Sequence, residues 1–363
     1  MCNACIPILN EAKPVDEFAD KLLAILNHGA LSLMVSIGHR TGLFDSLAEL
    51  GMASAENIAA HAGLESRYIK EWLAAMVVGG IIQYQAEDEH YLMPDSHGAL
   101  LCRKSSPDNL AVFAQYIGML GQVEDKIVDC FRQGGGVAYE HYPRFHEVMA
   151  EDSNQTVLSS LDEHILPLLG NDLQRLQQGA QVLDIGCGKG RALLHMAQRF
   201  PASQFTGYEL SAAAVEYAQN QADSRGLNNL VFEQRDLSHF DREAESQAFD
   251  FITAFDAIHD QGNPQGVLDG IYRSLKPAGV FLMQDIRASS QLENNLQHPV
   301  GPLLYTISTM HCMTVSLAQG GAGLGTMWGE ELALSMLQQA GFTEIAVRQL
   351  PHDFQNNFYL MKK

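Results

Sequence analysis

The sequence predicts an α/β protein with an open, mostly parallel sheet in its C-terminal half and a mostly helical N-terminal half. Residues 182–190 read as an apolar strand running into a glycine-rich turn, and helical spacing follows from Arg191. Further apolar runs at 205–209, 231–237, 249–255 and 280–285 continue the sheet. A closing hairpin is predicted over 344–350 and 357–361, which makes the last strand antiparallel.

The glycine-rich turn is the first candidate binding element. Gly186, Gly188 and Gly190 let the chain turn sharply and leave room for a ligand against the main chain. In an open α/β sheet the ligand is expected at the carboxyl ends of the strands. Asp184 stands at that end, where a carboxylate suits an ammonium or sulfonium group better than a pyrophosphate.

Two further acids follow the next strands. Glu209 comes 19 residues after Gly190, at the expected tip of the second strand, where it can accept hydrogen bonds from both ribose hydroxyls. Asp236 ends the third strand and is placed to meet an adenine amino group. Ribose and adenine contacts together with a cationic, phosphate-free tail describe S-adenosylmethionine.

With these motifs in this order, the C-terminal half resembles the class I S-adenosylmethionine-dependent methyltransferases. The resemblance implies a Rossmann-like, seven-stranded methyltransferase sheet with its last strand antiparallel. It extends more loosely to the N-terminal half, which is similar to the dimerisation domain of small-molecule O-methyltransferases. The cofactor-binding residues that we expect are Asp184, Gly186, Cys187, Gly188, Gly190, Glu209, Leu210, Asp236, Leu237, Phe255 and Asp256.

The loop after the fourth strand carries the candidate catalytic residues. A neutral imidazole there could take a proton from an acceptor hydroxyl, and His259 matches the general base of the plant-type O-methyltransferases. Asp285, at the end of the fifth strand, matches the acid that orients this base. The sequence departs from that pattern in two ways: Gln261 replaces the usual tryptophan, and no acid follows Gly320-Gly321. N-, S- or C-methylation, or proximity-driven transfer without a base, therefore stays open.

The N-terminal half divides into two expected parts before the methyltransferase domain at 179–363. Residues 1–104 show a winged-helix pattern: amphipathic helices, one closed by Gly42, then a two-stranded wing. Residues 1–100 contain five Lys or Arg against 13 Asp or Glu, which disfavours DNA binding. In the resembling enzymes this module dimerises. Residues 105–178 are expected to form a helical connector that contributes to the active site.

Two segments are expected to supply the substrate pocket. The connector offers Tyr139, Tyr142 and His146, and residues 286–328 form an insertion too long for a plain connection, with a possible helix at 303–317. That insertion reads as a lid with glycine hinges, and it offers Met310 and His311. Methionine at apolar spacing is usually core packing, so no metal site is predicted there.

Composition narrows the partners. The net charge of −20 disfavours nucleic acid and anionic membranes and favours a small molecule or a protein. No secretory signal and no membrane span are expected, and scattered cysteines fit a reduced, cytoplasmic protein; Cys2-x-x-Cys5 has no partner pair.

Two alternative functions remain: a nicotinamide-dependent oxidoreductase, and an S-adenosylmethionine-sensing regulator that binds DNA.

Overall fold

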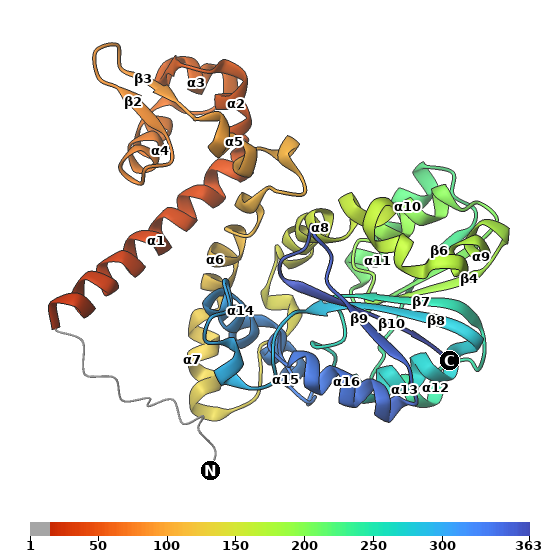
Figure 1. Cartoon of the computed structure of the whole chain (residues 1–363). Helices are drawn as coiled ribbons and strands as arrows, with labels where there is room; N and C mark the ends of the chain where they lie inside the picture. Colours follow the sequence, from red (N-terminus) through yellow and green to blue (C-terminus); the bar gives the residue numbers. More distant parts are fainter. Residues whose placement is uncertain (1–14) are drawn as a thin grey trace. The chain divides into compact units, whose positions relative to one another are not determined.

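The computed structural model describes residues 15–363, which divide at Gly118/Met119 into two compact units (Figure 1). The cysteine pair at positions 2 and 5 lies outside the described residues. The helices and strands of the first unit are α1 (Val15–Thr41), α2 (Leu43–Leu50), β1 (Ala53–Ser54), α3 (Ala55–Ala62), α4 (Ser66–Val78), β2 (Gln83–Gln85), β3 (His90–Leu92), α5 (Asp95–Leu101) and the 3-10 turns η1 (Arg103–Ser105) and η2 (Leu110–Val112). Helix α6 (Gln115–Leu120) crosses the division.

The first unit has the winged-helix order that the sequence predicts. Gly42 follows α1 in the left-handed conformation, with φ 74°, and the Ser54 side chain accepts the Asn57 backbone N–H to cap α3. The wing has three strands, in the order β1-β3-β2, because the short β1 pairs with β3 beside the expected hairpin. Phe44 and Trp72 meet edge to face, 5.4 Å between ring centroids, in the core of the unit.

Helix α1 joins this core only through its C-terminal half, where the Trp72 indole donates to the Met34 carbonyl at 2.8 Å. Apolar residues nearer its start are exposed, among them Leu22 at 45% and Leu26 at 68%. No membrane span was expected from the sequence, but by length and composition the stretch Glu17–Thr41 is long and apolar enough to cross a membrane. An exposed apolar face of this size marks a surface for interaction.

The second unit opens with the connector, whose elements are the 3-10 turn η3 (Gly121–Val123), α7 (Glu124–Gln133), the 3-10 turn η4 (Tyr139–His141), α8 (Phe145–Thr156), the 3-10 turn η5 (Leu158–Ser160), the π-helical turn η6 (Leu161–Ile165), the 3-10 turn η7 (Leu166–Asp172) and α9 (Leu173–Gln178). Its sheet contains β4 (Gln181–Ile185), β5 (Gln204–Glu209), β6 (Leu230–Gln234), β7 (Phe249–Phe255), β8 (Leu275–Ile286), β9 (Ile345–Arg348) and β10 (Asn356–Lys362). The remaining helices are α10 (Arg191–Arg199), α11 (Ala212–Ser224), α12 (Phe240–Glu243), α13 (Pro264–Ser274), the 3-10 turn η8 (Leu292–Asn295), α14 (Gly301–Ile307), the π-helical turn η9 (Ser308–Cys312), α15 (Met313–Ala318) and α16 (Gly329–Ala340).

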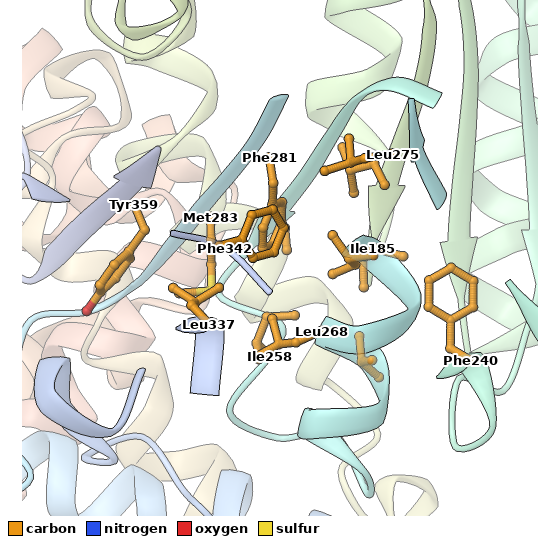
Figure 2. Close-up of a cluster of buried hydrophobic side chains, with 14 of the residues drawn as sticks. Ile185, Phe240, Ile258, Leu268, Leu275, Phe281, Met283, Leu337, Phe342 and Tyr359 are labelled. Atoms are coloured by element: carbon orange, nitrogen blue, oxygen red, sulfur yellow. The ribbon is translucent and has the colours of Figure 1, made fainter. Parts of the chain in front are cut away.

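The sheet has seven strands in the order β6-β5-β4-β7-β8-β10-β9, and β10 runs antiparallel to both of its neighbours. This confirms the predicted sheet. Alternate residues of each strand face opposite sides. Helices α9, α10 and α11 pack on one face, while α12, α13 and α16 pack on the other (Figure 1). Figure 2 shows part of the second face, where Phe281 and Met283 of β8 meet Leu337 of α16 and the following Phe342.

Three predicted boundaries differ in detail. Strand β6 ends at Gln234, so Asp236 lies in the loop beyond it. Strand β8 begins at Leu275, five residues before the predicted apolar run at 280–285, because Leu275 pairs with Phe249 before an irregularity in register. The lid helix expected at 303–317 is interrupted by the π-helical turn η9, in which both His311 and Cys312 are buried.

Candidate active site

A cavity of about 630 Å³ lies at the carboxyl ends of β4, β5 and β7, where the order of the parallel strands reverses. The connector and the lid complete its walls through α8 and α15. Predicted site residues that line it are Tyr139, Tyr142, His146, Asp184, Gly186, Cys187, Gly188, Glu209, Leu210, Asp236, Leu237, Phe255 and Asp256. Predicted residues outside the lining are Gly190, His259, Asp285, Met310 and His311.

The glycine turn after β4 has two separate roles. Gly188 has φ 53°, and a Cβ added there would meet no atom within 4 Å, so its backbone is open. Gly190 has φ 67°, and an added Cβ would lie 2.4 Å from the Phe232 ring of β6. Gly188 therefore leaves space at the cavity wall, whereas Gly190 allows α10 to begin close to the sheet.

Asp184 is a buried carboxyl at the cavity, with 3% of its surface exposed. Burial raises its pKa to about 7, although the Thr253 hydroxyl donates to Oδ1 at 2.6 Å and opposes the shift. A cation bound beside this carboxyl would favour its ionised form.

The acids after β5 and β6 are oriented by backbone donors. Glu209 accepts the Gly188 N–H at 3.0 Å and the Ser211 N–H at 2.8 Å, one on each carboxylate oxygen. Asp236 accepts the hydroxyl and the N–H of Ser238, and these hydrogen bonds lower its pKa. Both acids line the cavity with Asp184, as the strand pattern predicted.

His259 and Asp285 form the predicted dyad. Nδ1 of His259 lies 2.9 Å from Oδ1 of Asp285, and both residues are buried. The same oxygen accepts the Trp328 indole N–H at 3.0 Å and the Ile286 N–H at 2.8 Å. Burial by itself would lower the pKa of His259, but the Asp285 carboxylate outweighs it and the pKa lies well above its usual 6.5.

The dyad lies beside the cavity rather than in its wall. The Cys312 thiol of the lid is hydrogen-bonded to the His259 ring. Asp256, which lines the cavity, has Oδ1 3.7 Å from Nδ1 of His259 and a left-handed φ of 55°. Asp256, His259 and Asp285 bring potential metal-ligand atoms within 4.8 Å, but the direct His259–Asp285 hydrogen bond occupies part of that cluster.

The connector and the lid meet through aromatic and polar contacts. The Tyr139 hydroxyl donates to Oδ2 of Asp260, and the Tyr142 hydroxyl donates to the Met310 carbonyl. His311 is buried and stacks on Phe145 with 3.7 Å between ring centroids. Met310 and His311 thus touch residues that line the cavity, although neither lines it itself.

Sequence reasoning missed three residues of this region. Asp260 lines the cavity and directly follows His259, so its position in the loop was a usable signal. Phe145 also lines the cavity, and its place among the connector aromatics was a second signal. Trp328 has no comparable signal, because its contact with Asp285 spans 43 positions and depends on the path of the lid.

Comparisons with known proteins agree with this architecture. Residues 29–103 match the Rv2258c-like winged HTH domain, and residues 176–341 match a methyltransferase domain. A sterol 24-C-methyltransferase of Gibberella zeae is 28% identical over 224 residues, which are 61% of this chain and 55% of that protein. The chain therefore spans about half the length of this relative.

Solved structures share the fold over the whole chain. A proposed O-methyltransferase of Nostoc punctiforme has a TM-score of 0.70 at 17% identity, covering 97% of this chain and 100% of that one. Human N-acetylserotonin methyltransferase in complex with S-adenosylmethionine has a TM-score of 0.65 at 16% identity, and the match covers 98% of this chain and 99% of that one. With both domains matched and the predicted sheet present, the chain combines a winged HTH domain with a methyltransferase domain and has the fold that its resemblance to the class I S-adenosylmethionine-dependent methyltransferases implied.

Proposed function

We propose that this protein transfers a methyl group from S-adenosylmethionine to a small-molecule acceptor bound in the cavity. The observation that carries the proposal is the presence of Asp184, Glu209 and Asp236 in one cavity beside the open backbone of Gly188. The buried Asp184 carboxyl suits a ligand with a positive charge, and the other two acids are oriented to accept hydrogen bonds.

The residues of this chain would bind and orient the donor. Glu209 would accept from the ribose hydroxyls, Asp236 would face the adenine, and Asp184 would favour the cationic end. Bound S-adenosylmethionine supplies an electrophilic methyl group on a sulfonium. Walls from α8 and α15 exclude water and hold the acceptor in line, which is the main requirement of such a transfer.

A hydroxyl acceptor would use His259 as general base and Asp285 as the residue that positions it. The carboxylate on Nδ1 fixes the tautomer and leaves the other ring nitrogen to hold the acceptor's proton. The acceptor hydroxyl must then take the place of the Cys312 thiol at the ring. We propose this arrangement as the route to O-methylation.

N- or S-methylation by proximity is the second candidate. The observation that favours it is that His259 does not line the cavity, whereas Asp256 and Asp260 do. A neutral amine or a thiolate needs orientation more than a dedicated base.

The winged-helix unit is proposed to form a homodimer through the exposed apolar face of α1. Its acidic composition disfavours a role in reading DNA. The hydrogen bond from the Trp72 indole to the Met34 carbonyl ties α1 to the core of the unit, which favours a protein surface over a membrane span. Among the described residues Cys102, Cys130, Cys187 and Cys312 are free thiols, which supports a cytoplasmic location.

Calorimetric titration with S-adenosylmethionine, S-adenosylhomocysteine and NAD tests the proposal. We expect binding of the first two and none of the third. Turnover is then measured as transfer of labelled methyl to a library of small hydroxyl, amine and thiol compounds. A protein that binds NAD in place of S-adenosylmethionine, or that binds specific DNA tightly at physiological salt, contradicts the proposal.

A further inference from the structure

The acceptor side of the cavity differs in charge from the donor side. The inference drawn from this difference rests on the proposed function. The donor side is formed by the glycine turn and the ends of β5 and β6. The other side is formed by the connector, the loop after β7 and the lid. Its aromatic and charged lining residues include Tyr139, Tyr142, Phe145, His146, Asp256 and Asp260.

The cationic residues of the lining belong to the donor side and are already engaged. The Lys189 ammonium lies 4.8 Å from the centre of the Tyr217 ring. The Arg235 guanidinium lies 4.6 Å from the centre of the Tyr208 ring, and Arg191 donates to the Ala150 carbonyl at 2.8 Å. No lysine or arginine of the connector, of the loop after β7 or of the lid lines the cavity.

Three acids of the acceptor side line the cavity, Glu140, Asp256 and Asp260, and the last two share one nearby cationic group, His259, whose Nδ1 lies 3.7 Å from Oδ1 of Asp256. Asp256 has an Oδ1 that is buried without a hydrogen-bond partner, and its left-handed backbone is strained for a residue other than glycine. Burial raises the pKa of Asp256 to about 7 and raises that of Asp260. Burying a carboxylate oxygen without a hydrogen-bond partner is costly, and a bound cation would add to the compensation that His259 gives.

Asp260 is the better placed of the two to bind an acceptor. The Tyr139 hydroxyl donates to its Oδ2 and so orients the carboxylate, while Oδ1 remains for a ligand. The Tyr139 ring packs against Phe145, with 5.5 Å between the ring centroids, and Phe145 in turn stacks on His311. Aromatic faces beside a carboxylate are a suitable environment for an organic ammonium group.

We propose that the acceptor carries a basic amine whose ammonium group binds Asp260 beside Tyr139. Anionic molecules of the same size are excluded by Asp256 and Asp260. The ammonium serves as the recognition group, so the inference holds whether the methylated atom is oxygen or nitrogen.

The test uses the full chain saturated with S-adenosylhomocysteine and a panel of probes that differ only in charge. Tyramine, 4-ethylphenol and 4-hydroxyphenylacetate share the phenol ring and carry a positive, zero and negative charge; further triplets on other ring systems extend the panel. Calorimetry measures each Kd. We expect the amine of a triplet to bind at least tenfold more tightly than its acid, with the neutral member between them.

Asp260→Asn is the informative variant, and Glu140→Gln is its matched control. Glu140 is also an acid of the cavity lining, but its side chain is 81% exposed, so solvent screens its charge. We expect Asp260→Asn to weaken amine binding about tenfold while the neutral probe changes less than twofold, and Glu140→Gln to change both less than threefold.

Equal or tighter binding of the acids overturns the inference, as does an amine preference that survives in Asp260→Asn. A panel in which no amine binds, while S-adenosylhomocysteine still does, rejects the inference and leaves the methyltransferase proposal standing. Failure to bind S-adenosylhomocysteine rejects the methyltransferase proposal itself.

Discussion

Nδ1 of His259 lies 2.9 Å from Oδ1 of Asp285, and this hydrogen bond joins the loop after β7 to the end of β8. Trp328 of the lid donates to the same carboxylate oxygen, so three elements converge on one buried acceptor. Because the carboxylate favours the charged imidazole, the His259 pKa lies well above 6.5. A raised pKa keeps the imidazole protonated up to a higher pH, so His259 can act as a base only above that pH. The first prediction follows from this.

If His259 is the base, kcat should rise with pH through the raised pKa of this residue. Below that pKa the imidazole is protonated and cannot accept the proton of the acceptor, so the rate falls up to tenfold per pH unit. The measurement is the pH profile of kcat with a hydroxyl acceptor at saturating donor. A profile that is flat from pH 6 to 9 contradicts the role of His259.

Asp285→Asn should shift that profile. Loss of the carboxylate removes the main interaction that raises the pKa of His259, so the acidic limb should move to lower pH. We also expect kcat to fall about 10- to 100-fold, because the ring loses its orienting partner. The matched control is Asp250→Asn, which removes a carboxylate at the start of β7, paired with Arg175 and Lys276. A control that shifts the profile equally would refute a specific role for Asp285.

Much of the sheet and of this dyad could be predicted because the signals are local. The strand–turn–helix pattern around Gly188 and the acids at 184, 209 and 236 follow from short apolar runs and their ends. His259 and Asp285 were predicted to pair because they match the base and the orienting acid of the plant-type O-methyltransferases, which follow the fourth strand and end the fifth. The structure confirms that β7 and β8 pair in parallel.

The contacts made by the lid could not be predicted. Cys312 contacts His259 although 53 positions separate them in the sequence, and Cys312 lies at the end of the π-helical turn η9, which the spacing of apolar residues did not predict. An ideal helix would turn adjacent residues in different directions, so the pattern around His311 and Cys312 gave no indication of joint burial. Long-range packing, rather than local periodicity, decides this part of the site.

Donor binding should depend on the protonation of Asp184. In the protein without a ligand the pKa of Asp184 is about 7, and a cationic ligand favours the ionised form of this carboxyl. Below pH 7 binding must therefore release a proton, and affinity for S-adenosylmethionine should fall up to tenfold per pH unit. Calorimetry in buffers of different ionisation heat measures the proton release.

Thr253→Val supplies the control for this linkage. The Thr253 hydroxyl donates to Asp184 and lowers its pKa, so its loss should move the decline in affinity to higher pH. Asp184→Asn should remove the pH dependence and weaken binding at pH 8. Unchanged affinity between pH 5.5 and 8 in the wild type would exclude Asp184 as the partner of the positive charge.

The exposed face of α1 should hold two chains together. A double change of Leu22→Glu and Leu26→Glu adds two charges to this face, and sedimentation velocity should then report the mass of one chain instead of two. Tyr68→Glu, at an exposed apolar site on α4, serves as the control and should leave the dimer intact. A wild-type chain that sediments as a monomer at micromolar concentration contradicts the proposed dimer.

Two glycines of one turn should separate stability from donor binding. Gly190→Ala places a Cβ against the Phe232 ring in a left-handed backbone, so we expect unfolding free energy to fall by about 2–4 kcal/mol. Gly188→Ala meets open space, so only the backbone strain of about 1 kcal/mol applies. The methyl group that Gly188→Ala adds lies where the donor should approach the backbone. Affinity for S-adenosylmethionine should therefore fall at least tenfold. Urea unfolding and calorimetry measure the two effects, and equal loss of stability in both variants would show that the Phe232 contact is not what requires glycine at position 190.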